Sequence, residues 1–287
     1  MRKQTLIMIS ALALISFVFM GCGEESDEES DTETILEPWM TLPELIDAGA
    51  SILWVGAHGD DEIVASPILS KACRGLGNPC HILVLTRGES GTCYTPPCLP
   101  DLVTVRTQEM REAACRYGAD LEIHDFTNHP SPYPPIEEVL VAWESEGDPL
   151  GIIVETIRRF RSDVILCFDP SHGFYGHTEH QTVGILVQEA AGLAGDPGYG
   201  GSMTKPFRPT KLYHLLNRYW FMIPVGWDEG PVDERIYFHE PCPGSSKTCF
   251  EEGLSAASAH RSQWPYVAVM ALGGQLVQEG LLKNVDF

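Results

Sequence analysis

The chain has 287 residues, of which 44% are hydrophobic and 21% charged, which is enough for one large domain with a full core and excludes a wholly disordered protein. It carries 19 Lys and Arg against 40 Asp and Glu, a formal net charge of −21. Binding to nucleic acid requires clustered basic side chains that replace counterions on phosphates, so we expect no nucleic acid partner. An acidic surface is also a common solubility device.

The beginning of the chain has the pattern of an export signal. Two basic residues precede an apolar run from about residue 6 to residue 20, and a glycine and Cys22 follow. The run is shorter than the roughly 20 residues that span a bilayer. We therefore expect residues 1–21 to be a lipoprotein-type signal peptide and Cys22 to carry a lipid anchor in a bacterial cell envelope, in the periplasm or at the outer membrane. Phe19 and Met20 fit the usual motif poorly, so plain secretion or an uncleaved anchor stays open.

Residues 22–40 are strongly acidic. Within them, residues 23–38 contain eight acidic side chains and no basic one. Such a segment cannot bury enough apolar surface to fold, so we predict an extended tether. Residues 41–287 are then expected to form the folded domain.

Runs of β-forming apolar residues alternate along the chain with helical patterns. In chain order, strands are predicted at residues 51–58, 81–88, 121–126, 163–170 and 211–217, and helices at 63–77, 105–120, 151–162 and 180–195. Continuous apolar runs are typical of strands that are buried on both faces. The alternation predicts an α/β fold: a single domain with a Rossmann-like, mostly parallel sheet and helices on both faces.

Nine cysteines are many for a cytosolic protein but ordinary for an exported one. Three pairs lie close together in or beside Gly- and Pro-rich segments, where each can close a short loop as a disulfide: Cys73 with Cys80, Cys93 with Cys98, and Cys242 with Cys249. A structural zinc site is the competing interpretation, although it needs four ligands at closer spacing. Cys115 and Cys167 lie in apolar stretches, where we expect free buried thiols.

Two groups of ionisable side chains follow predicted strands. His58, Asp60 and Asp61 follow the first strand, and His177 and His180 open the helix that follows the strand at 163–170. Ligands bind at the carboxyl ends of parallel strands, so both groups belong to the same rim of the sheet. Two imidazoles and a carboxylate match the three protein ligands of a catalytic zinc site, and imidazole favours zinc over magnesium. For the first group alone, helix capping explains the two aspartates equally well.

With these motifs the chain resembles the PIG-L/LmbE-like zinc-dependent N-deacetylases. Their first motif, (A/P)-H-P-D-D-E, corresponds to residues 57–62, with Gly59 in place of the proline. Their second motif, H-P-D-H after a glycine-rich turn, corresponds to residues 173–180, with Thr178 and Glu179 in place of Pro-Asp. Further similarities lie at residues 86–89, 106–109 and 259–263, so the resemblance spans most of residues 51–265.

The resemblance implies a role for each residue at these positions. His58, Asp61 and His180 would bind one zinc ion, Asp60 would be the general base, and His177, in its protonated form, would be the electrophile. It also implies that Arg106 binds substrate, although an Arg that pairs with Glu109 on the helix surface is an equally good interpretation. Asp169 and His172 are candidates to orient a ligand, and His260 is expected to be a core histidine.

The implied activity is removal of an N-acetyl group from an N-acetylglucosamine-type sugar or glycoconjugate. A zinc amidase for a non-sugar amide and a non-catalytic exported carbohydrate-binding lipoprotein are the alternatives. Trp54, Trp220 and Trp264 are candidates for stacking on a sugar, but a core role is expected for most of the chain's tryptophans and tyrosines. The loop at 88–100 is expected to overhang the rim and shape substrate entry, unless it is only a tolerated insertion. The sequence does not indicate an oligomeric state.

Overall fold

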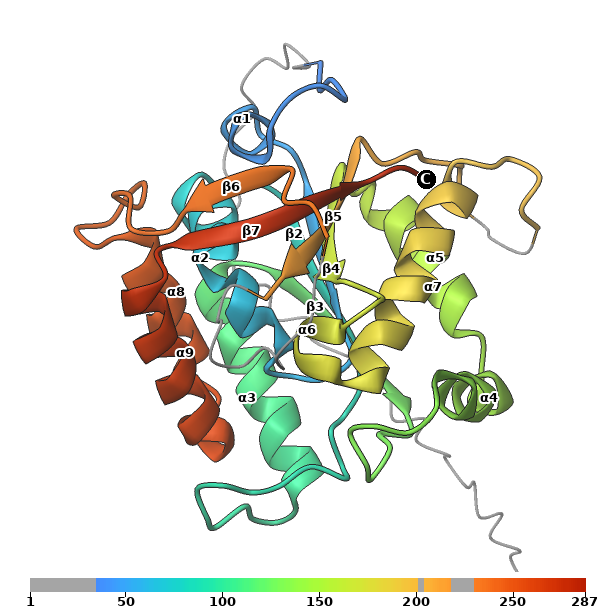
Figure 1. The fold of residues 1–287 in the computed structure, drawn as a ribbon, viewed down its shortest axis with the longest axis vertical. Coiled ribbons are helices and arrows are strands. Elements are labelled where there is room, and N and C mark those ends of the chain that lie inside the picture. The colour runs from blue at the N-terminus through green and yellow to red at the C-terminus, as the bar shows by residue number, and fades with distance from the viewer. Residues whose placement is uncertain (1–34, 201–203, 218–229) are drawn as a thin grey trace, which may run out of the picture.

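The structure is a computed structural model that describes residues 35–200, 204–217 and 230–287. Its strands are β1 (Ile52–Gly56), β2 (Cys80–Thr86), β3 (Asp120–Phe126), β4 (Val164–Phe168), β5 (Lys211–Leu216), β6 (Glu234–Tyr237) and β7 (Glu279–Val285). They form one seven-stranded sheet in the order β3-β2-β1-β4-β5-β7-β6 (Figure 1).

The helices are α1 (Leu42–Asp47), α2 (Ser66–Leu69), α3 (Leu102–Tyr117), α4 (Ile136–Glu146), α5 (Pro149–Phe160), α6 (Gly173–Gly176), α7 (Thr178–Ala194), α8 (Cys249–Ala257) and α9 (Trp264–Leu276). Short 3₁₀ turns η1 (Asp61–Ala65) and η4 (Arg261–Gln263) and a π-type turn, η2 (Ser70–Gly75), complete the described elements. The predicted helix at 63–77 is therefore three short turns, because Pro67 near the start of α2 has no N–H to continue the pattern from η1.

The predicted α/β fold with a mostly parallel sheet is confirmed. β1 pairs in parallel with β2 and β4, β2 with β3, and β4 with β5. β7 runs antiparallel to both β5 and β6, so an antiparallel edge that the sequence did not predict extends the parallel part. All five predicted strands are present, with ends that differ by at most two residues.

The sheet separates two hydrophobic cores, as expected for strands buried on both faces. Ile52 and Trp54 of β1 point into a core that α1, α2, α3 and α8 cover. Leu53 and Val55, which alternate with them, point into a core that α4, α5 and α7 cover. Every residue of β1 is buried, which explains its continuous apolar run. The helices lie on opposite sides of the sheet in Figure 1.

The three predicted disulfides are confirmed: Cys73–Cys80, Cys93–Cys98 and Cys242–Cys249. The competing interpretation of these six cysteines as zinc ligands is wrong, because their sulfur atoms are bonded to each other. Cys167 is a free buried thiol, as predicted. The same prediction for Cys115 is wrong, because this residue lies on the exposed side of α3 and is disulfide-bonded.

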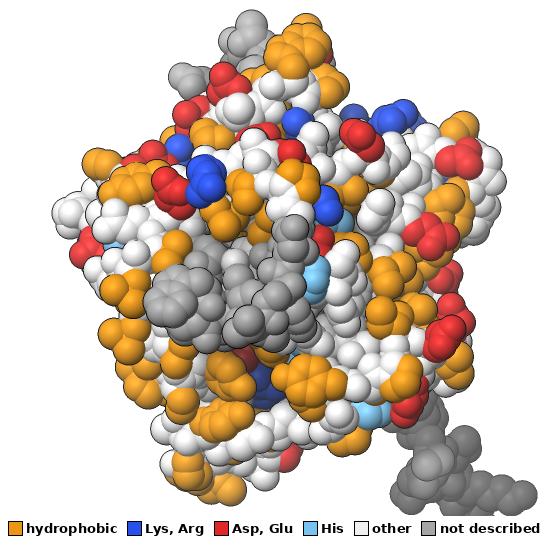
Figure 2. Space-filling view, in the orientation of Figure 1, with side chains coloured by type: hydrophobic (Ala, Val, Ile, Leu, Met, Phe, Trp, Pro, Cys, Tyr) orange, Lys and Arg blue, Asp and Glu red, His pale blue; other side chains and the backbone are white. Residues whose placement is uncertain are grey.

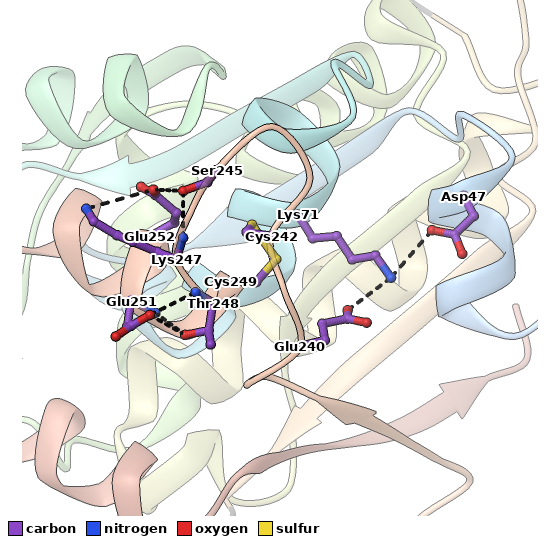
Figure 3. The surroundings of a disulfide bond; sticks show 10 residues. All are labelled: Asp47, Lys71, Glu240, Cys242, Ser245, Lys247, Thr248, Cys249, Glu251 and Glu252. Carbon is purple, nitrogen blue, oxygen red and sulfur yellow. Dashed lines mark hydrogen bonds and ion pairs between the residues drawn. A yellow bond between two sulfur atoms is a disulfide. The ribbon is translucent and has the colours of Figure 1, made fainter.

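The Cys242–Cys249 disulfide closes the loop between β6 and α8 (Figure 3). Beside it, the buried Lys71 of η2 pairs with Glu240 at 3.0 Å and with Asp47 of α1 at 3.4 Å. The disulfide therefore holds a loop that joins the C-terminal helices to the first helix of the domain.

Acidic side chains gather along the edge of the molecule where α4 and α5 lie, and hydrophobic ones are frequent over α8 and α9 (Figure 2). None of the helices within the described ranges is both long and apolar enough to cross a membrane. The predicted signal peptide at 1–21, the lipidation site Cys22 and most of the predicted tether lie outside the described residues, as does Trp220.

Candidate active site

Two loops meet at the carboxyl end of the sheet, as the sequence predicted. His58 and Asp61 follow β1, and His180 lies in the first turn of α7, after β4. His58 Nδ1 is 3.2 Å from His180 Nε2, and Asp61 Oδ1 is 3.0 Å from His180 Nε2 and 3.5 Å from His58 Nδ1. Atoms that share a tetrahedral zinc ion at ~2.0–2.1 Å lie roughly 3.3 Å apart, so these three donor atoms fit such an ion.

The backbone fixes the orientation of the Asp61 carboxylate. Its Oδ2 accepts hydrogen bonds from the backbone N–H groups of Ala57 and His58, each 2.8 Å long. The other oxygen, Oδ1, then faces the two imidazoles. Gly56 leaves the space for this arrangement, because a Cβ there would lie 3.1 Å from Asp61 Cβ and 2.9 Å from Trp54 Nε1.

Neighbouring acceptors set the tautomers of both imidazoles. His180 Nδ1 lies 3.1 Å from the carbonyl oxygen of Gly173, and His58 Nε2 lies 2.7 Å from Glu179 Oε2. A carbonyl or carboxylate oxygen only accepts, so these ring nitrogens carry the protons. In the neutral form of each ring, His180 Nε2 and His58 Nδ1 then have free lone pairs, which is the state in which histidine binds a metal.

Glu179 supports His58 in the structure, and sequence reasoning did not single it out. Its side chain is fully buried, and its oxygens accept from Asn128 Nδ2 and from the backbone N–H of His129, both at 2.8 Å, in addition to His58. Its position between two histidines in the second motif was the available signal. Asn128 lies in the loop after β3, and the sequence gives no comparable signal for it.

The electrostatics of the three donor residues favour a cation between them. Burial opposes a charge on His58, but Asp61 and Glu179 outweigh it and raise the pKa of His58 to about 10. Burial also opposes a charge on Asp61, yet His180 and His58 hold its pKa well below the usual range. The site thus attracts positive charge, and a metal ion can replace the proton.

His177 lies beside the donor residues. One nitrogen from each of His58, His177 and His180 lies within 4.8 Å of the others, and the His177 ring stacks on His180 with centroids 4.5 Å apart. Burial, His180 and His58 lower the pKa of His177 to about 2. A neutral imidazole still carries one N–H that can donate, so His177 can act as an electrophile in that form as well as in the protonated form that the resemblance implies.

A strained turn between β4 and α7 presents His180. Gly173 has φ +52°, and a Cβ there would lie 3.0 Å from His180 Cβ, so only glycine fits. Phe174 follows with φ +69°, which is unfavourable for a bulky residue. Asp169 organises the start of the turn, because its Oδ1 accepts from the backbone N–H groups of Ser171 and His172. Asp169 therefore orders the backbone of this turn, whereas the sequence analysis expected it to orient a ligand.

Asp60 faces the pocket and is held by Arg106 of α3. Arg106 Nη2 donates to Asp60 Oδ2 at 3.0 Å, and Nη1 donates to the carbonyl oxygen of Gly88 at 3.3 Å. The alternative surface pair with Glu109 is wrong: Arg106 is buried, and Glu109 accepts from the N–H and hydroxyl of Ser262. Arg106 thereby joins three of the segments that resemble the family, namely residues 57–62, 86–89 and 106–109.

Two other predicted details have structural explanations. His260 is fully buried and its Nε2 lies 2.8 Å from Glu62 Oε1, so it is a core histidine that supports η1, as expected. At Gly59, where the family has proline, a Cβ would come within 3.1 Å of Met110 Cβ in α3, which leaves little room for a larger residue.

The donor residues lie at the bottom of a pocket of about 300 Å³, the lower end of the range for small-molecule sites. The predicted loop at 88–100 does form one wall, as expected. Of the tryptophan candidates that the structure describes, Trp54 has the expected core role, and Trp264 is exposed but does not line the pocket. The pocket has tyrosines instead, namely Tyr94, Tyr133, Tyr175 and Tyr266.

Comparison with known proteins gives consistent results. Residues 53–191 match the family model described as "PIG-L: GlcNAc-PI de-N-acetylase". A 1D-myo-inositol 2-acetamido-2-deoxy-alpha-D-glucopyranoside deacetylase from Streptomyces scabiei (strain 87.22) is 27% identical over 195 residues, which cover 62% of this chain and 57% of that relative. The chain thus spans little more than half the length of this curated relative.

Solved structures share the fold. The N,N'-diacetylchitobiose deacetylase from Pyrococcus horikoshii superposes with a TM-score of 0.61 and 17% identity over 86% of this chain and 88% of its own. GalB, a 4-carboxy-2-hydroxymuconate hydratase from Pseudomonas putida KT2440, has a TM-score of 0.59 and 19% identity over 83% of this chain and 97% of its own. The fold therefore accommodates more than one reaction. Residues 53–191, which match the family model, contain both motifs, so the resemblance to the PIG-L family is confirmed for this part of the chain.

Proposed function

We propose that this chain is a zinc-dependent deacetylase that removes the N-acetyl group from an N-acetylglucosamine-type sugar or glycoconjugate. The observation that carries the proposal is the set of three donor atoms, from His58, Asp61 and His180, 3.0–3.5 Å apart at the bottom of a pocket. The named activity of the curated relatives supports the substrate class. A curated relative from Streptomyces coelicolor named mycothiol S-conjugate amidase is 29% identical over 175 residues, so an amidase is the second candidate function, whereas the comparisons give the binding-protein alternative no support.

In this proposal His58, Asp61 and His180 hold the zinc ion. When bound, zinc lowers the pKa of a water molecule toward neutrality and polarises the amide carbonyl. Asp60 accepts the proton of the attacking water, because it is adjacent to the ligand Asp61 and its carboxylate faces the pocket. Arg106 keeps that carboxylate in place through the 3.0 Å hydrogen bond.

His177 is the proposed electrophile. It lines the pocket, and its Nδ1 has no hydrogen-bond partner within the described part of the chain. As a neutral imidazole, it can donate one N–H to the oxygen on which negative charge develops. Proton transfer from Asp60 to the leaving amine then completes the reaction, with acetate and a free amine as products.

The proposed location is outside the cytoplasm, with a lipid anchor at Cys22. Three disulfides among the described cysteines support export, because such bonds persist in oxidising compartments. The anchor itself is proposed from the sequence motif alone.

The test combines metal analysis with an assay for released amine on N-acetylglucosamine and N,N'-diacetylchitobiose. Zinc should copurify, a chelator should abolish amine release, and added zinc should restore it. Asp60→Asn should retain zinc but lose hydrolysis. Wild-type activity in Asp60→Asn, or a purified protein that binds no metal, would refute the proposal.

A further inference from the structure

Aromatic side chains surround the mouth of the pocket, whereas polar donors lie at its bottom. The donor residues are buried, but Tyr94, Tyr133 and Tyr266 are 44%, 65% and 41% exposed while still lining the pocket. These rings therefore lie toward solvent from the reacting centre. They are placed to contact a part of the substrate that extends beyond the N-acetyl sugar.

Tyr94 and Tyr266 form a pair although they are far apart in sequence. Their ring centroids are 5.3 Å apart with an interplanar angle of 74°, and their hydroxyl oxygens are 3.5 Å apart. Tyr266 belongs to α9, whose Met270 also lines the pocket. The pair thus presents apolar ring surface and hydroxyl groups side by side, which suits a ligand with both CH faces and hydroxyls.

The loop that carries Tyr94 is fixed at several points. The Cys93–Cys98 disulfide closes it, and the backbone N–H of Tyr94 donates to the carbonyl oxygen of Ser262 at 2.9 Å. Gln263 Nε2 donates to the carbonyl oxygen of Thr92 at 2.9 Å. The loop is thereby attached to η4, directly before the helix that carries Tyr266, so both rings are held by one connected structure.

The same loop is connected to the bottom of the pocket. The N–H of Ser90 donates to Asn128 Oδ1 at 3.2 Å, and Asn128 in turn donates to Glu179. Gly91 lies so close to Arg106 that a Cβ there would be 2.7 Å from Nη1. The loop therefore lies over Arg106, and a ligand approaches from the tyrosine side.

We propose that Tyr94 and Tyr266 form a subsite for a second hydroxylated ring, linked to the N-acetyl sugar that reacts. Pro130, Pro132 and Tyr133 supply apolar surface from the loop between β3 and α4. The pocket of about 300 Å³ suits a single sugar at the bottom, so the second ring lies at its mouth. This inference rests on the proposed deacetylase function and names Tyr94 and Tyr266 as the residues that favour a two-ring substrate over the monosaccharide.

The test measures kcat/KM of the zinc-loaded chain for N,N'-diacetylchitobiose and for N-acetylglucosamine. In the Tyr94→Ala/Tyr266→Ala variant, the ratio of the two values should fall about tenfold, mainly through KM for the two-ring substrate. Tyr94→Phe/Tyr266→Phe should retain most of the preference if ring stacking dominates. Tyr237→Ala removes an equally exposed tyrosine of β6 that does not line the pocket, and it should keep the wild-type ratio.

A second pair of variants tests the role of the disulfide. Cys93→Ser/Cys98→Ser should lower the ratio in the same direction, whereas Cys242→Ser/Cys249→Ser, which opens a loop outside the pocket, should not. An unchanged ratio in the double tyrosine variant overturns the subsite, and an unchanged ratio in the Cys93→Ser/Cys98→Ser variant overturns its dependence on the disulfide.

Binding separates failure of this inference from failure of the proposed function. If the wild type releases amine from neither substrate, the deacetylase proposal fails, and calorimetric binding of N,N'-diacetylchitobiose decides the subsite. Weaker binding by the double tyrosine variant than by the wild type supports the subsite. Equal binding by both proteins, or no binding by the wild type, overturns it.

Discussion

Replacing Glu179 with glutamine should weaken zinc binding without removing a ligand. Both Glu179 oxygens accept hydrogen bonds: Oε2 from His58 and Asn128, and Oε1 from the His129 N–H. A glutamine has only one acceptor oxygen, so either orientation places its NH₂ group against a donor. If the NH₂ faces His58, the imidazole must change tautomer and direct an N–H at the ligand position.

The expected effect follows from the role of such supporting groups. Loss of a carboxylate behind a metal-binding histidine typically costs about 10–100-fold in metal affinity, or about 1.4–2.8 kcal/mol. The upper part of that range is expected here, because Glu179 is fully buried and no water can replace the lost acceptor. Competition with a chromophoric chelator at fixed pH gives the zinc dissociation constant directly.

Glu109→Gln is the matched control. Glu109 is also a buried glutamate with two hydrogen bonds, but its partner is Ser262, and it contacts none of the proposed ligands. Glu109→Gln should therefore lower stability while keeping the zinc affinity of the wild type. A Glu179→Gln protein with wild-type zinc affinity would show that His58 needs no support from the carboxylate, and the reasoning would be refuted.

Three further predictions concern other parts of the molecule. Arg106→Met removes the cation that donates to Asp60, a charged hydrogen bond that contributes ~1.5–3 kcal/mol. We expect kcat/KM to fall about 10–100-fold while zinc stays bound, and an unchanged kcat/KM would contradict this role of Arg106. Cys242→Ser/Cys249→Ser opens a loop whose cysteines are 7 residues apart, and calorimetry should show a loss of about 2.5 kcal/mol in the free energy of unfolding, or about 5–10 °C in Tm. An unchanged Tm would show that the ion pairs of Lys71 are sufficient to hold the loop. His214 on β5 has its pKa lowered to about 4 by burial, although Asp169 opposes this. His214 therefore takes up a proton below about pH 6.5 in the unfolded chain but only below about pH 4 in the folded chain, so the free energy of unfolding falls as pH drops from about 6.5 to about 4. In denaturant unfolding, the free energy of unfolding of His214→Asn should change less with pH in that window.

The centre of the parallel sheet was predictable because β1, β2 and β4 are buried along their whole length and have nearly continuous apolar sequences. The antiparallel edge was not, because β6 and β7 have mixed patterns that become strands only by pairing with each other and with β5. Residues 264–276 of α9 contain no charged residue and two glycines, so they show no helical periodicity. β6, β7 and α9 therefore form through contacts with residues that are distant in sequence.

The same distinction applies to the site. His58, Asp61 and His180 were predictable because a strand end and a helix start place them within short motifs. Asn128 and the paired tyrosines were not, because each comes from a different loop and gains its role only when those loops meet. The disulfide prediction succeeded at short spacing, whereas Cys115 shows that an apolar neighbourhood in sequence does not establish a buried thiol.

A hydratase and a deacetylase share this fold, so the sheet alone does not determine the substrate. In this chain the donor residues are fixed by strand ends, a strained glycine turn and buried hydrogen bonds, which leave little freedom for change. The walls come from loops after β2 and β3 and from α9, where substitutions disturb no strand. Selectivity for a substrate should therefore lie in Tyr94, Tyr133 and Tyr266, and the Cys93–Cys98 disulfide gives the first of these loops the rigidity that a selective wall requires.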